Sequence, residues 1–170
     1  VSFEGAPNPF DPRTELVRVA VQGRRVPVDQ RRSVHLTFLV DTSGSMQSAD
    51  KLQLAQYALG ALTKELVDGD TVAIVTYAGS AGVVLPPTAM SRRDEVLRAL
   101  GRLSAGGSTA MGEGITLAYR LAEQTFHEGA VSRVIIASDG DANVGLSSYE
   151  DMLKTIQVEV DKGVMLSTIG

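Results

Sequence analysis

The chain has 170 residues, of which 44% are hydrophobic and 21% charged, as in an ordinary globular protein with room for one sizeable core. Its formal net charge of −4 offers no basic surface of the kind that nucleic-acid binding needs. The absence of cysteine excludes disulfides, thiolate metal sites and a cysteine nucleophile, and no apolar run approaches the roughly 18 residues of a membrane-spanning helix.

Residues 1–33 are expected to form an N-terminal arm that carries one extra strand. The stretch VSFEGAPNPFDP at residues 1–12 holds three of the six prolines, which fit neither a helix nor a central strand, so an extended arm is predicted. Apolar and polar residues alternate over 15–23, which is typical of a strand with one exposed face. The chain starts without an initiator methionine or a signal-like segment, and we expect it to be a piece of a longer protein.

From Val34 onward, strand-like and helix-like patterns alternate along the chain. Continuous apolar runs over 34–41 and 71–79 are typical of strands buried on both faces. Further strands are expected at 82–89, from Ser132 into a polar loop, and at 164–170. Apolar residues at helical spacing predict helices within 49–70, 91–103, 110–129 and 147–163. Ser91 is expected to cap the second of these helices.

Buried strands that alternate with amphipathic helices predict a Rossmann-like three-layer α/β/α sandwich with a mainly parallel central sheet. The segment 82–89 contains two adjacent prolines and is therefore expected to be an antiparallel edge strand, in a hairpin with its neighbour. In such sheets, ligands bind outside the carboxyl ends of the strands. Functional residues are therefore to be sought where the strands end.

Three polar clusters fall at strand ends or before a helix: Asp41, Ser43 and Ser45; Ser108 and Thr109; and Asp139, Asp141 and Asn143. They supply hydroxyl and carboxylate oxygens without a nearby nitrogen or sulfur donor, a set that suits a cation of the size of Mg²⁺. Neighbouring glycines, among them Gly44 and Gly107, allow the backbone to approach closely. Each cluster alone could be a polar turn or a helix cap, but all three in this order favour a metal site.

The pattern Asp41-x-Ser43-x-Ser45, followed by Thr109 and then Asp139-Gly140, resembles the metal-ion-dependent adhesion site of von Willebrand factor A domains. The resemblance covers residues 34–170. The stretches FLVDTSGSM, GGSTAMGEGI and ASDGDANVG are similar to a bacterial branch of that family, in which an extra strand-containing segment precedes the domain. The stretch ELVRVAVQGRRV resembles that segment.

The resemblance implies that Ser43, Ser45 and Thr109 bind Mg²⁺ through their hydroxyls, with Mn²⁺ and Ca²⁺ as alternatives, while Asp41 and Asp139 act largely through bound waters. Neutral direct ligands leave the divalent charge only partly offset, so the open position should favour an anionic oxygen. In the family, an acidic residue of a partner protein supplies it, and the domain is a binding module without enzymatic activity. The residues expected to shape the loops or line the rim are Gly44, Ser108, Gly140, Asp141 and Asn143, and for Asp141 and Asn143 we expect no direct metal contact.

The same residues argue against two other functions. A phosphatase of the haloacid dehalogenase kind needs a second aspartate two residues after the first, and Ser43 stands there. A serine hydrolase needs a nucleophile elbow and a catalytic base, whereas His35 is expected to be a packed strand residue and His127 to contact the last carbonyls of its helix. A scaffold domain whose metal only stabilises the loops stays open as an alternative.

Family members usually continue beyond the position that matches Gly170 with a further strand and a closing helix, and we expect the domain to be truncated there. In members that switch affinity, that helix responds to ligand binding. The bacterial resemblance also favours a location in the cell envelope. The oligomeric state and the partner are left open by the sequence.

Overall fold

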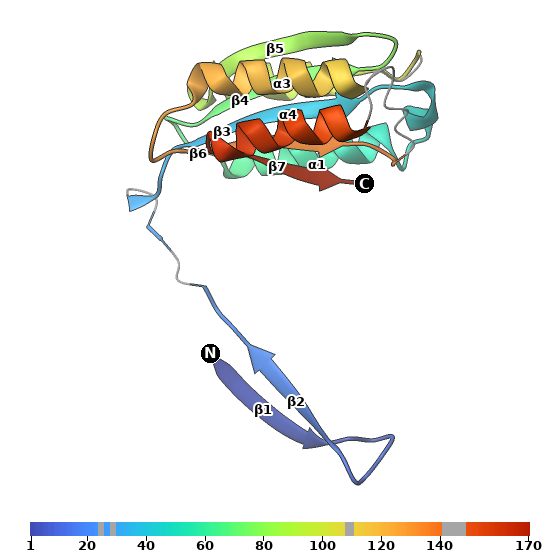
Figure 1. Ribbon diagram of the computed structural model, residues 1–170, viewed down its shortest axis with the longest axis vertical. Coiled ribbons are helices and arrows are strands. Elements are labelled where there is room, and N and C mark those ends of the chain that lie inside the picture. The colour runs from blue at the N-terminus through green and yellow to red at the C-terminus, as the bar shows by residue number, and fades with distance from the viewer. Residues whose placement is uncertain (24–25, 28–29, 108–110, 141–148) are drawn as a thin grey trace. The chain divides into compact units, whose positions relative to one another are not determined.

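The computed structural model describes residues 1–23, 26–27, 30–107, 111–140 and 149–170, and the chain divides into two compact units, Val1–Arg31 and Arg32–Gly170. The first unit is an antiparallel hairpin of β1 (Ser2–Pro7) and β2 (Glu15–Ala20) (Figure 1). The strand predicted over 15–23 is confirmed as β2, but the extended arm predicted over 1–12 is wrong, because this segment contains the second strand, β1. Pro7 lies at the end of β1 and the next two prolines lie in the connecting loop, where no ladder hydrogen bond is lost.

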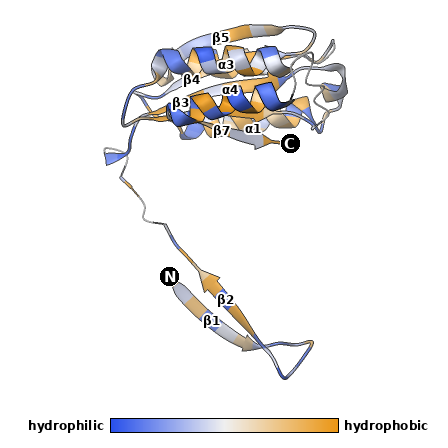
Figure 2. Ribbon diagram, viewed as in Figure 1, coloured by the Kyte–Doolittle hydropathy of each residue, from blue (hydrophilic) through white to orange (hydrophobic). Residues whose placement is uncertain are grey.

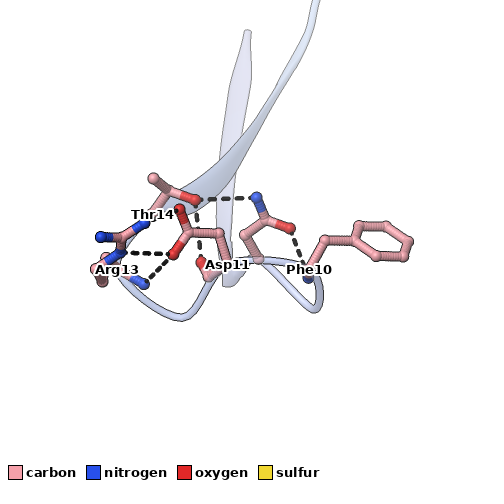
Figure 3. Close-up of polar contacts among 5 residues, drawn as sticks. Phe10, Asp11, Arg13 and Thr14 are labelled. Carbon is pink, nitrogen blue, oxygen red and sulfur yellow. Dashed lines mark hydrogen bonds and ion pairs between the residues drawn. The ribbon is translucent and has the colours of Figure 1, made fainter.

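The loop between β1 and β2 is closed by its own polar side chains (Figure 3). The Asn8 amide nitrogen donates to Thr14 Oγ1 at 2.9 Å, and the Phe10 backbone nitrogen donates to Asn8 Oδ1 at 2.9 Å. The Arg13 guanidinium donates to the Asp11 carboxylate at 3.0 Å and holds the pKa of Asp11 below its ordinary value. These local bonds determine the geometry of the turn without a hydrophobic core.

The second unit contains a five-stranded sheet in the order β5-β4-β3-β6-β7. Its strands are β3 (Val34–Asp41), β4 (Thr71–Tyr77), β5 (Ala81–Ala89), β6 (Val131–Ala137) and β7 (Val164–Ile169). All neighbours are parallel except β5, which pairs antiparallel with β4 at the edge, as predicted. Because Thr88 pairs with Val72 and Leu85 with Ile74, the two prolines of β5 lie opposite a single residue of β4 and form a bulge.

Helices cover both faces of this sheet (Figure 1): α1 (Leu52–Glu65), α2 (Arg93–Gly101), α3 (Met111–Thr125) and α4 (Tyr149–Asp161). A hydrophobic core lies on each face of the sheet, and alternate residues of β3 point into one core or the other. Phe38 packs with residues of α1 and α2, and Leu39 packs with residues of α3. The strands of the sheet are mainly hydrophobic, whereas the helices carry both kinds of residue (Figure 2). The predicted three-layer α/β/α fold with a mostly parallel sheet is thus confirmed.

The helix boundaries differ from the predictions at two places. The helix expected within 49–70 begins only at Leu52, after a short 3-10 turn at Gly44–Gln47. Ser91 is not a helix cap, because it lies within a second 3-10 turn, Met90–Arg92, and α2 starts after that turn with no side-chain cap. None of the described helices is long and apolar enough to cross a membrane.

Helix α3 crosses the sheet at close range at Gly114. A Cβ atom at this position would lie 3.0 Å from Tyr77 Cβ and 3.1 Å from Leu39 Cδ1. The Tyr77 Cβ is attached directly to the backbone of β4 and cannot move aside easily. We expect Gly114→Ala to lower the free energy of unfolding by about 1–3 kcal/mol, although alanine favours a helix by about 1 kcal/mol. Urea unfolding of the purified domain measures this difference.

Gly60 of α1 is the matched control for that experiment. A Cβ atom there would meet only Leu97 Cδ2, at 3.8 Å, which is an ordinary contact. Gly60→Ala is therefore expected to leave stability unchanged or to raise it by up to about 1 kcal/mol. Equal stability of the two alanine variants would contradict the close approach of α3 to the sheet.

Two histidines meet at the amino end of the sheet, opposite the strand ends described below. His35 is 7% exposed, as expected of a packed strand residue, and its Nδ1 lies 2.9 Å from Thr71 Oγ1. His127 lies against it with 5.0 Å between ring centroids, and its Nδ1 is 3.3 Å from the carbonyl oxygen of Thr125, the last residue of α3, which confirms the predicted helix-end contact. Burial lowers the pKa of His35, His127 lowers it further, and Asp70 acts in the opposite direction.

This lowered pKa predicts a loss of stability in mild acid. Above the ordinary value of 6.5, His35 is neutral in both the folded and the unfolded chain. As the pH falls below that value, the unfolded chain takes up the proton first, so stability is lost until the pH has passed the native pKa. Between about pH 7.5 and about pH 5.5, the Tm is expected to fall less in His35→Asn than in the parent protein. The same fall in both proteins would exclude His35 as a cause of acid sensitivity.

Candidate metal centre

Asp41 is the last residue of β3 and lies at the carboxyl end of the sheet between β4 and β6. Its side chain is fully buried, with 0% exposure. Oδ1 accepts a hydrogen bond from the Ser43 backbone nitrogen at 2.8 Å, and Oδ2 accepts one from Ser138 Oγ at 3.2 Å. Both of these donors are neutral, so neither of these two hydrogen bonds brings a positive charge to the carboxylate.

Ser43 and Ser45 bring two hydroxyls together directly beyond Asp41. Their Oγ atoms lie 3.1 Å apart, with Ser43 buried and Ser45 exposed, so the pair lies at the boundary between the interior and solvent. The 3-10 turn that carries Ser45 is held by Met46, whose backbone nitrogen donates to the Ser43 carbonyl at 3.1 Å and whose side chain is 2% exposed. Met46 therefore anchors the turn in the core, while Ser45 beside it stays exposed to solvent.

The glycine-rich loop before α3 is held against this turn by backbone hydrogen bonds. Gly106 N donates to the Thr42 carbonyl at 2.7 Å, and Gly44 N donates to the Gly107 carbonyl at 3.1 Å. Gly107 has a φ of +96°, in the region that favours glycine, and a Cβ atom there would lie 3.3 Å from Gly79 N. The predicted site residues Ser108 and Thr109 follow directly but lie outside the described residues.

Asp139 follows β6 and is the second carboxylate at the carboxyl end of the sheet. Its side chain is only 6% exposed, and Oδ2 lies 2.7 Å from Lys51 Nζ. Ser138, directly before it, donates to Asp41 through Oγ and accepts a hydrogen bond from Gly140 N at 3.2 Å on the same oxygen. The predicted rim residues Asp141 and Asn143 lie outside the described residues.

Tyr77, at the end of β4, is a further polar group of this region. Its backbone pairs in register with Asp41, and its buried hydroxyl lies near Asp41 and Ser138 without a hydrogen bond of ordinary geometry to any described residue. Burial raises the pKa of Tyr77, a contact with Ser138 opposes that rise, and the carboxylates of Asp41 and Asp139 add to it. The hydroxyl therefore stays protonated and available as a donor toward the site.

The sequence reasoning missed three residues of this region: Tyr77, Ser138 and Lys51. For Tyr77 and Ser138 a signal was present, because one ends a buried strand beside Asp41 and the other precedes Asp139. For Lys51 no signal existed, since its contact with Asp139 spans 88 residues of sequence. Of the predicted metal ligands, the structure describes Asp41, Ser43, Ser45 and Asp139, and it places all four at the carboxyl ends of the central strands β3 and β6.

The described donors fit a hard divalent cation. They are two buried carboxylates and two converging hydroxyls, all oxygen, beside glycines that bring the backbone close. The full burial of the Asp41 carboxylate next to neutral donors is the specific feature that a bound cation would explain. Oxygen donors with few carboxylates suit Mg²⁺ or Mn²⁺ better than a metal that prefers nitrogen or sulfur.

Sequence comparison matches residues 36–142 to the family of the von Willebrand factor type A domain. The protein YfbK of Escherichia coli K12 is 38% identical over 168 residues, which cover 99% of this chain and 29% of YfbK. A UPF0353 protein of Mycobacterium sp. strain KMS is 30% identical over 172 residues, covering 91% of this chain and 50% of that protein. The chain thus spans half or less of the length of these relatives.

Solved structures show the same fold. The conserved hypothetical protein BatB from Bacteroides thetaiotaomicron superposes with a TM-score of 0.68 at 28% identity, over 81% of this chain and 66% of that chain. A mussel byssus matrix protein with a zinc-occupied metal-ion-dependent adhesion site has a TM-score of 0.67 at 24% identity, over 82% and 36% of the two chains. The manganese-loaded TRAP protein of Plasmodium vivax has a TM-score of 0.66 at 20% identity, over 82% and 57%.

Proposed function

Because the chain belongs to the von Willebrand factor type A domain family, we propose that it binds one divalent cation, Mg²⁺ or Mn²⁺, at the carboxyl ends of β3 and β6 and uses it to bind a carboxylate of a partner protein. The observation that carries this proposal is the buried Asp41 carboxylate beside the Ser43–Ser45 hydroxyl pair.

In this proposal, Ser43, Ser45 and Thr109 hold the cation through their hydroxyls, and Asp41 and Asp139 hold it through water. Neutral direct ligands leave much of the divalent charge uncompensated, and an anionic oxygen is the natural ligand for the remaining position. The cation then serves recognition, and no residue of the site is required to move a proton. This is the reason for proposing a binding module in place of an enzyme.

Two further parts of the proposal rest on the sequence. The N-terminal unit, residues 1–33, is proposed to be a family-specific extension of the metal-binding domain at 34–170. The proposed location is the bacterial cell envelope. In support of the metal, two proteins with the same fold are described as carrying zinc or manganese. Those metals belong to these proteins, and for this chain the cation is a proposal.

Acetate is a suitable probe of carboxylate binding when the partner is unidentified. The Mn²⁺-loaded protein is expected to accelerate the relaxation of the acetate methyl protons well beyond that of acetamide, its neutral analogue, because only acetate can bind the cation as an anion. Calorimetric titration with MnCl2 establishes first that the cation is bound. Binding of Mn²⁺ with equal relaxation of acetate and acetamide would contradict the adhesion function and support the scaffold alternative.

A further inference from the structure

Lys51 and Asp139 form an ion pair inside the proposed metal site. Lys51 Nζ lies 2.7 Å from Asp139 Oδ2, and the two residues come from the start of α1 and the end of β6. The side chain of Asp139 is 6% exposed and that of Lys51 is 38% exposed. The ammonium therefore reaches from the solvent boundary to a carboxylate that is almost completely buried.

Lys51 lies at a position where a positive charge is normally unfavourable. It occupies the position directly before α1, where the unpaired backbone N–H groups of the first turn disfavour a positive charge. No acidic residue lies in that first turn to offset it. Lys51 contacts the buried carboxylate of Asp139, and the neighbouring Asp50 carboxylate also attracts it, so the position next to Asp139 favours a lysine despite the helix start.

We propose that Lys51 is an internal counter-ion of the metal site, which neutralises Asp139 when no divalent cation is bound and competes with the cation for that carboxylate. The inference rests on the proposed metal binding and adds to it a residue that controls metal affinity. Lys51 can leave Asp139 without unfolding of α1, because 38% of its side chain is exposed to solvent.

The counter-ion has opposite effects on the two binding steps. Asp41 and Asp139 together carry two negative charges, and Lys51 reduces the net charge of these three groups to one negative charge. A divalent cation is therefore attracted less strongly when Lys51 is present. Once the cation is bound, the same positive charge leaves the site net positive, which favours the carboxylate of a partner. Removal of Lys51 should thus strengthen metal binding and weaken carboxylate binding.

The test is a calorimetric titration of the parent protein, Lys51→Met and Lys51→Arg with MnCl2. Methionine keeps the length of the side chain without its charge, and arginine keeps the charge. Lys51→Met is expected to bind Mn²⁺ about tenfold more tightly than the parent, because a positive charge that repels the cation is removed, and Lys51→Arg to remain close to the parent. Lys64→Met, an exposed change in the last turn of the same helix, is the matched control and should leave the affinity unchanged.

A second measurement separates an effect on the site from a loss of the fold. In EDTA, Lys51→Met leaves Asp139 without its lysine, so its Tm should be lower than that of the parent, and saturating Mn²⁺ should raise the Tm of Lys51→Met by more than it raises that of the parent. Equal or weaker binding of Mn²⁺ by Lys51→Met, with the parent binding normally, would overturn the role of Lys51 alone. If neither protein bound Mn²⁺, the proposed metal function would be overturned together with it.

Discussion

Asp41→Asn is expected to lower the affinity for Mn²⁺ by about 100-fold, the upper end of the range for residues that support a metal site from outside its direct ligands. The reason is that Asp41 provides a full negative charge at 0% exposure, where solvent screens it little. The measurement is a calorimetric titration with MnCl2, repeated with MgCl2. An affinity within threefold of the parent would contradict the assignment of Asp41 to the site.

The asparagine variant is chosen because it can keep the local hydrogen bonds. Its amide oxygen can accept from the Ser43 backbone nitrogen as Oδ1 does now, and its amide nitrogen can donate to Ser138 Oγ. In EDTA, its Tm should therefore stay close to that of the parent, which separates metal loss from misfolding. Asp68→Asn, at an exposed carboxylate before the amino end of β4, is the control for a general charge effect and should leave Mn²⁺ affinity nearly unchanged.

Asp70→Ala is expected to destabilise the domain by about 2–5 kcal/mol, because it leaves two backbone donors without their acceptor. Asp70 is 1% exposed, and its Oδ1 accepts from Val34 N while its Oδ2 accepts from Val67 N, each at 2.8 Å. One carboxylate thus joins the start of β3 to the turn that leads from α1 into β4. Urea unfolding with the linear extrapolation measures the loss.

Asp68→Ala provides the matched control, two residues earlier in the same turn. Asp68 is exposed, and substitution of a surface residue of this kind usually changes stability by no more than about 0.5 kcal/mol. A small effect of Asp70→Ala, similar to that of Asp68→Ala, would mean that water satisfies the two N–H groups when the carboxylate is removed. The contribution of Asp70 to the fold would then have to be assigned to another contact.

The parts of the fold that could be predicted from sequence depend on local patterns. The apolar runs of β3 and β4, the helical spacing in α1 and the two prolines of β5 each act within a few residues, and the structure confirms all of them. The first strand was missed because prolines argue against a strand in general, whereas Pro7 lies at a strand end where its missing N–H costs nothing. Ser91 failed as a cap because a 3-10 turn takes the place of the expected helix start.

In the candidate site, too, some residues could be predicted from sequence and others could not. Asp41, Ser43 and Asp139 were found because strand ends in a parallel sheet converge, which is a rule of topology and needs no knowledge of distances. Lys51 could not be found, because its contact with Asp139 depends on where the start of α1 lies relative to the end of β6. Strand order can thus bring candidate ligands together, whereas a contact such as that of Lys51 with Asp139 requires the packed structure.

The bulge in β5 has a consequence for how the protein behaves at high concentration. Pro86 and Pro87 sit side by side on a strand at the edge of the sheet, opposite one residue of β4, and neither has a backbone N–H. A β-strand of a neighbouring molecule cannot form a continuous ladder along such an edge, and the bulge also twists the strand away from a flat approach. The edge formed by β5 therefore disfavours fibril-like self-association, whether or not a metal is bound.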